Sequence, residues 1–187
     1  MKQKLILIGA STGGPGHLKK LLSGISLPSN VSVVIAQHMN KNFVGSFANG
    51  LAQELKSGVE LLNNKITLQN KIYICEQNSI MLNHQLLTAN IDQSGVTTTY
   101  NPNVNMLFNS AVPLCRIVDV MGILLTGIGD DGASGLNELY KAGAKCIAEN
   151  EQSAIVYGMP KRAKDINPKL EIGNLDMIKT NLQRFIV

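Results

Sequence analysis

The sequence predicts an α/β fold, a doubly wound and mostly parallel sheet flanked by helices (Rossmann-like), with an appended antiparallel hairpin. Apolar runs of strand length occupy residues 5–8, 31–36 and 120–126, and a weaker run covers 145–148. These runs are nearly continuous rather than alternating, which is typical of parallel strands covered on both faces. Helical patterns between the runs supply the covering layers.

Two apolar stripes indicate helices packed on this sheet. One runs from Phe43 to Leu55 in steps of four residues, and the other runs from Leu175 to Phe185 in steps of three and four. Such spacings place the residues on one helix face, so we interpret both stripes as core faces rather than cofactor-binding features. Pro15 suits the first turn of a helix that follows the first strand.

The segment from Tyr73 to Ala89 predicts the antiparallel hairpin. Apolar residues at 80–82 and 86–87 flank the turn-like pair Asn83-His84. Asn and Gln are frequent from residue 63 to 109, but hydrophobic residues continue throughout. We therefore expect loops and short elements there rather than a disordered linker, with residues 106–108 in the core.

Composition narrows the class of protein. The 187 residues fit one domain with a substantial core, and the net charge of +4 favours an acidic partner without requiring nucleic acid. With four Tyr, four Phe and no Trp, the chain lacks the stacking platforms of single-strand binders. Its three cysteines show no C-x-x-C spacing, which predicts neither a disulfide framework nor a metal site and favours a reducing cytoplasm. The first apolar run is too short for an export signal or for membrane insertion.

A serine, a histidine and an aspartate each follow one of the predicted strands. Ser11 lies in Gly-Ala-Ser-Thr-Gly-Gly (9–14), His38 in Gln-His-Met (37–39) and Asp131 in the glycine-rich stretch 126–132. The carboxyl ends of parallel strands share one edge, where ligand sites form. A neighbouring imidazole activates a serine hydroxyl, and a carboxylate orients the imidazole. The sequence therefore predicts a hydrolase that cleaves an ester or amide with this triad.

The glycines around Ser11 allow a sharp strand-to-helix turn and bring main-chain N–H groups close to a developing oxyanion. Residues 9–13 also fit the G-x-S-x-G nucleophile elbow. Here, however, the elbow follows the first strand, and the triad order is Ser, His, Asp. A classical lipase or esterase is therefore not predicted, although triads recur on unrelated folds in every order.

Competing interpretations exist for several of these residues. We interpret His17 and His84 as surface or satisfied structural histidines. Asp131 also fits the cap of a helix that begins near Gly132, and Asp130 could fill that capping role instead, with its neighbour catalytic. Nucleotide binding is a rival function, but the turn lacks G-x-G-x-x-G and the second strand ends in Gln-His rather than an acidic residue.

Longer motifs give a more specific indication. The segments 8–14, 37–39, 107–108, 125–133, 152–153 and 157–160 stand in the order found in the catalytic domain of the chemotaxis protein-glutamate methylesterases, the CheB-type methylesterases. The sequence resembles that family over nearly its whole length. The resemblance implies a triad of Ser11, His38 and Asp131, and on motif alignment it favours Asp131 over Asp130. Active-site support, including the oxyanion side, then falls to Thr12, Gly13, Gly14, Met39, Ile128 and Gly129.

The resemblance also implies an activity. The family removes methyl groups from glutamate side chains on the cytoplasmic helices of methyl-accepting chemoreceptors, releasing methanol through an acyl-enzyme, and deamidation of receptor glutamines stays open. Receptor cytoplasmic domains are the expected partners, with other chemotaxis proteins as further candidates. The expected location is the cytoplasm, and no metal or organic cofactor is implied. Residues 1–187 are expected to form a single catalytic domain without the family's phosphorylatable receiver domain.

Two segments depart from the family pattern. Its Arg-Pro-Ser-Val-Asp appears here as Asn-Pro-Asn-Val-Asn (101–105), and its Ala-Pro-Gly stretch with a following His appears as Cys-Glu-Gln (75–77) with Ile80 in the His region. These changes concern substrate recognition rather than the triad. They motivate a second hypothesis, a catalytically inactive module that docks on the receptor.

Overall fold

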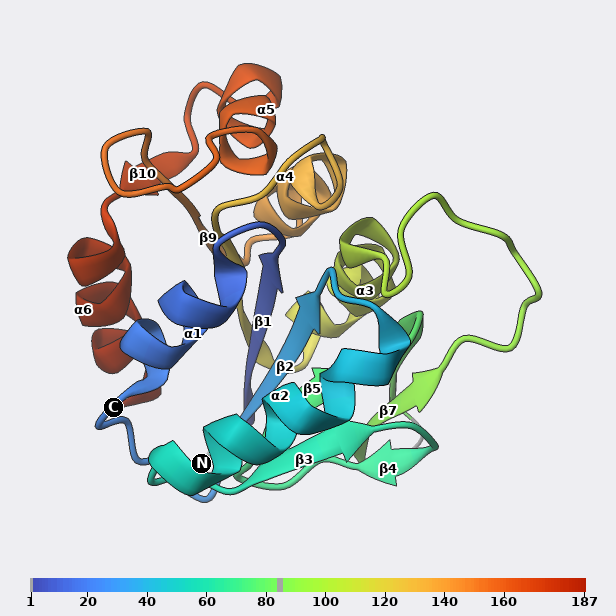
Figure 1. Cartoon of the computed structure of the whole chain (residues 1–187). Coiled ribbons are helices and arrows are strands. Elements are labelled where there is room, and N and C mark those ends of the chain that lie inside the picture. Colours follow the sequence, from blue (N-terminus) through green and yellow to red (C-terminus); the bar gives the residue numbers. More distant parts are fainter. Residues whose placement is uncertain (1, 84–85) are drawn as a thin grey trace.

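A seven-stranded sheet lies at the centre of the computed structural model, which describes residues 2–83 and 86–187 (Figure 1). The strand order is β10-β9-β8-β1-β2-β5-β3, and every neighbouring pair is parallel. The strands of this sheet are β1 (Lys4–Ala10), β2 (Val31–Gln37), β3 (Val59–Leu62), β5 (Ile72–Cys75), β8 (Asp119–Leu124), β9 (Lys145–Glu149) and β10 (Glu171–Gly173). The predicted parallel α/β fold is confirmed.

Helices cover both faces of the sheet, so each strand has two buried faces. One face carries α1 (Gly14–Leu22), α2 (Lys41–Glu54) and α6 (Leu175–Ile186). The other carries α3 (Val104–Ala111), α4 (Ala133–Lys141), α5 (Met159–Ile166) and the 3-10 helix η1 (Val112–Arg116). Along β1, Ile6 and Ile8 pack toward the first helix layer, while Leu5 and Leu7 pack toward the second. This explains the continuous apolar runs of the sequence.

The chain changes direction at β1. From β1 it proceeds to β2, then to β3 at the sheet edge and back to β5 between them, and it continues through β8, β9 and β10 on the other side of β1. In such sheets, crossovers diverge at the carboxyl ends of the strands where the order reverses, and this divergence leaves a crevice for ligands. Here the reversal lies at the ends of β1, β2 and β8.

A small antiparallel sheet stands apart from the main one. It consists of β4 (Ile66–Thr67), β7 (Leu87–Ile91) and β6 (Ser79–Asn83), paired in that order. The predicted hairpin is thus confirmed as β6 and β7, but β4 joins it to make a separate sheet rather than an extension of the parallel one. The first part of the predicted segment, residues 73–75, belongs instead to β5 of the parallel sheet. His84, assigned to the hairpin turn, lies outside the described residues.

Two details of the predicted packing differ from the structure. The buried face of α2 consists of Val44, Ala48 and Leu51, and Phe43 is 64% exposed. A strict four-residue step drifts around a helix of 3.6 residues per turn, so the predicted stripe rotates off the core at its start. In α3, Leu107 and Phe108 are fully buried as predicted, whereas Met106 is only partly covered. Among the helices of the described residues, none is long and apolar enough to cross a membrane.

Candidate active site

The three triad candidates meet at one edge of the parallel sheet. Ser11 directly follows β1, His38 directly follows β2, and Asp131 precedes α4 in the loop after β8. The main-chain N–H of His38 donates to the carbonyl of Ala10 at 2.9 Å, which continues the β1–β2 pairing past the strand ends. The N–H of Ser11 donates to the carbonyl of Thr126 at 2.9 Å on the β8 side. Strand register therefore brings these distant segments together.

His38 and Asp131 form a short, nearly buried pair. His38 Nε2 lies 2.7 Å from Asp131 Oδ2, and the two side chains are 10% and 2% exposed. The Asp131 carboxylate also accepts the N–H groups of Val104 at 2.7 Å and Asn105 at 2.8 Å. These N–H groups belong to the first turn of α3, where the helix dipole favours a negative charge. The Asp131 carboxylate is thus held by both His38 and the start of α3.

This geometry separates the two aspartates. Asp131 caps α3 from outside that helix, while α4 begins after Gly132 without any side-chain cap. Asp130 is exposed. The proposed capping role of Asp131 therefore exists, but toward a different helix, and it leaves one carboxylate oxygen in contact with the imidazole.

The segments that carry Ser11 and His38 are linked through main-chain carbonyl groups. The Gln37 side-chain Nε2 donates to the carbonyls of Ser11 at 3.0 Å and His38 at 2.8 Å, so one buried amide joins the two segments. His38 Nδ1 is buried and has no hydrogen-bond partner in the described part of the chain. Because Nε2 is engaged by Asp131, Nδ1 is the nitrogen left for a serine hydroxyl. Catalytic contacts of this kind are often open without substrate.

The turn that follows Ser11 needs its glycine, because Gly13 has a φ of +82°. The loop after β8 approaches just as closely: a Cβ placed on Gly127 would lie 2.7 Å from Ser11 Cβ. Gly14 cannot act on a substrate, since its N–H donates to the carbonyl of Ser11 at 2.8 Å. Within residues 2–83 and 86–187, the N–H groups of Thr12, Gly13, Ile128 and Gly129 donate to no protein acceptor. They are the candidate oxyanion donors.

The remaining support residues have distinct positions. Met39 packs half-buried against the core beside α2, so its contacts are those of a packing residue. Ile128 is 59% exposed on the loop after β8. Gly129 has a φ of +89°, and a Cβ there would meet the hydroxyl of Tyr100.

Sequence reasoning missed Glu149, the last residue of β9. Its fully buried carboxylate accepts the Thr126 N–H at 2.8 Å and the Ser153 hydroxyl at 2.7 Å, and it lies 3.0 Å from His17 Nδ1. Because the Thr126 carbonyl accepts the N–H of Ser11, Glu149 supports the turn that holds Ser11 indirectly, through Thr126. The same strand-exit rule that found His38 would have found Glu149. His17 is buried and paired, as expected of a structural histidine.

The altered segment 101–105 is built into the wall of the site. Asn101 Oδ1 accepts the Asn78 N–H at 2.6 Å, and Asn103 Oδ1 caps α3 by accepting the Met106 N–H at 2.7 Å. Asn105 Oδ1 accepts the Gly135 N–H at 2.8 Å and so ties α3 to α4. Asn103 and Asn105 therefore fix the start of α3, whose N–H groups hold Asp131.

Cysteine and metal chemistry have little basis at this edge. In the described ranges, no cluster of three or more His, Cys, Asp or Glu side chains is placed to hold a metal ion. Burial raises the pKa of the Cys75 thiol to about 12 and likewise that of Cys146 to about 12, so neither thiol is activated as a nucleophile.

Comparison with known proteins decides the family. The model of the CheB methylesterase family matches residues 6–182. The chain belongs to the CheB methylesterase family. The catalytic domain of the Thermotoga maritima CheB methylesterase superposes with a TM-score of 0.86 over 100% of this chain and 98% of that one, at 23% identity. At that identity, the match shows a shared fold.

Curated members of the CheB family are more similar in sequence. The protein-glutamate methylesterase/protein-glutamine glutaminase of Thiobacillus denitrificans is 36% identical over 98% of this chain. A protein of the same description from Pseudomonas aeruginosa, numbered 3, is 35% identical over 97% of this chain. The chain spans about half the length of these relatives, 52% and 54% respectively.

Proposed function

We propose that this chain is a serine hydrolase that demethylates glutamate methyl esters on the cytoplasmic helices of chemoreceptors. The observation that supports the proposal is the nearly buried His38–Asp131 pair at the sheet edge where Ser11 follows β1. Membership of the CheB family and the names of its relatives supply the substrate class. Those names also include glutaminase activity, which makes glutamine side chains a second candidate substrate.

In the proposed reaction, Ser11 Oγ attacks the ester carbonyl carbon while His38 Nδ1 takes the hydroxyl proton. Asp131 stabilises the imidazolium through Nε2. We assign stabilisation of the oxyanion to the N–H groups of Thr12 and Ile128, which donate to no acceptor in the described residues. Collapse of the tetrahedral intermediate breaks the bond to the methoxy oxygen, which leaves as methanol with the proton from His38. Water, activated by His38, then hydrolyses the acyl-enzyme and frees the glutamate and Ser11.

The geometry argues against the rival nucleotide-binding function. A phosphate at the start of α1 would need open main-chain N–H groups. The Gly14 N–H is already bonded to the carbonyl of Ser11, and the Gln37 side chain lies against Gly14, where an added Cβ would come 2.0 Å from its Oε1. At Gly14, the protein itself occupies the position that a phosphate would need.

The decisive experiment measures methanol release from membranes that carry methylated chemoreceptors. Wild-type protein should release methanol and should be labelled at Ser11 by a fluorophosphonate, whereas Ser11→Ala should do neither. A folded wild type that binds the receptor without releasing methanol would identify a docking module instead. Labelling of Ser11 without methanol release would support a serine hydrolase but contradict the proposed methyl-ester substrate.

Two neighbouring aspartates provide a matched control for the triad. Asp131→Asn should lower kcat by about a thousandfold or more, because the amide no longer stabilises the imidazolium. Asp130→Asn should retain wild-type turnover, because Asp130 is exposed and outside the pair. Equal losses in both variants, measured with a small neutral ester, would contradict the assignment of Asp131.

A further inference from the structure

Tyr100 covers the imidazole of His38. The two rings are parallel, with 4.3 Å between their centroids and 4° between their planes. Tyr100 belongs to the long segment that leaves β7 and returns to α3, drawn in yellow-green at the right of Figure 1. A ring from a loop far along the chain therefore lies face to face with the proposed general base.

The same tyrosine reaches the loop after β8. A Cβ placed on Gly129 would lie 2.4 Å from the Tyr100 hydroxyl oxygen, so the hydroxyl rests directly over this glycine. The ring thus extends from His38 to the turn that carries the N–H of Ile128. It forms one wall of the space beside the imidazole and keeps water from that face.

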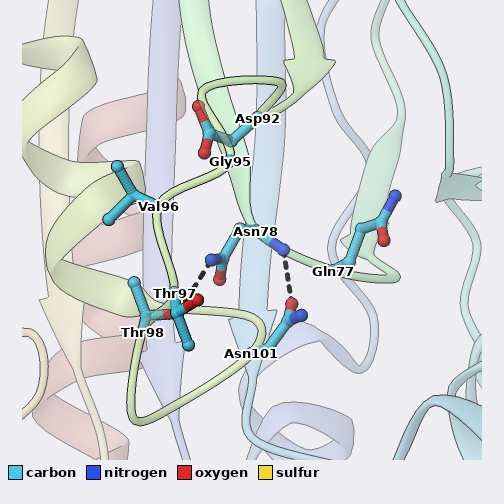
Figure 2. A pocket seen from close by; sticks show the side chains of 8 residues that line it. All are labelled: Gln77, Asn78, Asp92, Gly95, Val96, Thr97, Thr98 and Asn101. Atoms are coloured by element: carbon cyan, nitrogen blue, oxygen red, sulfur yellow. Dashed lines mark hydrogen bonds between the residues drawn. The ribbon is translucent and has the colours of Figure 1, made fainter.

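Asn78 anchors the segment on both sides of Tyr100. Figure 2 shows its side-chain amide donating to the Thr98 hydroxyl at 2.8 Å and its main-chain N–H donating to Asn101 Oδ1 at 2.6 Å. Thr98 in turn donates to the carbonyl of Tyr100 at 2.6 Å. Asn78 Oδ1 accepts the N–H of Asn103 at 2.8 Å. These contacts hold the tyrosine backbone in place without any help from substrate.

The stack supplies a restraint that the triad lacks. Asp131 contacts only Nε2 of His38, and one hydrogen bond fixes a point on the ring but not the tilt of its plane. Parallel packing against an aromatic face fixes that tilt. The negative face of an aromatic ring also attracts a cation within about 6 Å, so the stack favours the imidazolium that forms when His38 takes a proton.

We infer that Tyr100, held by Asn78, is a positioning residue that sets the plane of His38 and stabilises its protonated form during the proposed hydrolysis. The inference rests on the proposed function. It is tested with a small neutral ester, for which KM reports direct contact with the loop and kcat reports the positioning of His38, and with the rate at which a fluorophosphonate labels Ser11.

Tyr100→Leu should lower kcat and the labelling rate roughly tenfold with little change in KM, because the leucine has no aromatic face. Tyr100→Phe keeps the ring and should restore kcat to within about threefold of wild type. Tyr140→Leu, a substitution on the exposed part of α4, controls for the loss of a tyrosine elsewhere. Asn78→Ala should reproduce the Tyr100→Leu loss, and the double variant should lose little more.

Ring-current shifts of the His38 proton resonances give a second readout that does not depend on turnover. They should persist in Tyr100→Phe and disappear in Tyr100→Leu. If the wild type is active and Tyr100→Leu keeps the wild-type kcat, or changes only KM, the positioning role is overturned and the proposed function stands. A wild type that neither turns over nor labels would overturn the proposed function, and the positioning role with it.

Discussion

At the scale of single residues, Glu149 shows how much of the site depends on a group that touches no substrate. Its carboxylate is fully buried and contacts three segments, through His17, Thr126 and Ser153. Two of these contacts adjoin the turn that holds Ser11: Thr126 accepts the Ser11 N–H, and His17 lies in α1, which follows that turn. A buried carboxyl group is tolerated in such a place only when hydrogen-bond partners satisfy it.

Glu149→Ala should therefore lower the free energy of unfolding by about 3–5 kcal/mol, because it leaves His17 buried beside an empty space and the Thr126 N–H without an acceptor. Urea denaturation measures the change. Glu151→Ala, two residues along the chain, removes an exposed carboxylate and should stay within about 0.5 kcal/mol of wild type. Equal free energies of unfolding for the two variants would show that the buried contacts of Glu149 make no net contribution to stability.

Candidate site residues could be predicted where a reactive side chain follows the end of a predicted strand. Ser11 and His38 stand directly after long apolar runs, so the topology of a parallel sheet predicted their common edge. Their contacts could not be predicted in the same way. The N–H groups that hold Asp131 belong to α3, which begins at Val104 inside a stretch rich in Asn and Gln, and composition gave no helix there.

At the scale of elements, α2 contains two glycines whose positions the packing does not require. Gly45 and Gly50 lie inside the helix, and a Cβ on either would meet no atom within 4 Å. Glycine costs a helix interior roughly 0.5–1 kcal/mol relative to alanine. The stability of α2 is therefore limited by its sequence rather than by its contacts.

Gly50→Ala should raise the free energy of unfolding by about 0.5–1 kcal/mol, measured by urea denaturation. Gly24→Ala is the matched control, because its surroundings are equally open but its φ is +76°. That substitution should instead destabilise the protein, by about 1 kcal/mol, since an L-residue is strained in the left-handed region. A stabilising Gly24→Ala would contradict the conformation at the end of α1.

Strands and helices with long runs or stripes of apolar residues could be predicted from the sequence, and short ones could not. The strands β1, β2, β8 and β9 are long and buried, and each appeared as a run in the sequence. The edge strand β10 has only three residues and β3 has four, too few for a periodicity to emerge. The helix α5 carries several charged residues on a short span, which hides its buried Met159 and Ala163.

At the scale of the whole molecule, the two halves of the sheet share one core beneath α3, α4 and α5. Cys75 of β5 and Cys146 of β9 lie in that core on opposite sides of β1. Burial raises the pKa of each thiol to about 12, while the thiol of Cys115 is more accessible and its pKa is raised by partial burial. The three free cysteines therefore report on different parts of the fold.

Below pH 8 these thiols are protonated in both the folded and the unfolded chain, so they do not affect the pH dependence of stability. Above about pH 9 the unfolded chain loses their protons while the folded chain keeps them, so the free energy of unfolding should fall as the pH rises toward 12. The limiting slope is about 1.4 kcal/mol per pH unit for each thiol. Cys75→Ala and Cys146→Ala together should flatten the decline relative to wild type, and Cys115→Ala should change it less.

Thiol labelling at pH 8 tests the same arrangement from the folded side. Cys115 should react first with an aromatic disulfide reagent, because it is partly exposed. Cys75 and Cys146 should react only through opening of the core, and because one core unites the two halves of the sheet, both should report the same opening free energy. A Cys146 that labels much faster than Cys75 would mean that the β8-β9-β10 side opens separately. In that case the contacts of Glu149, at the end of β9, with the segment beside Ser11 would break before the whole protein unfolds.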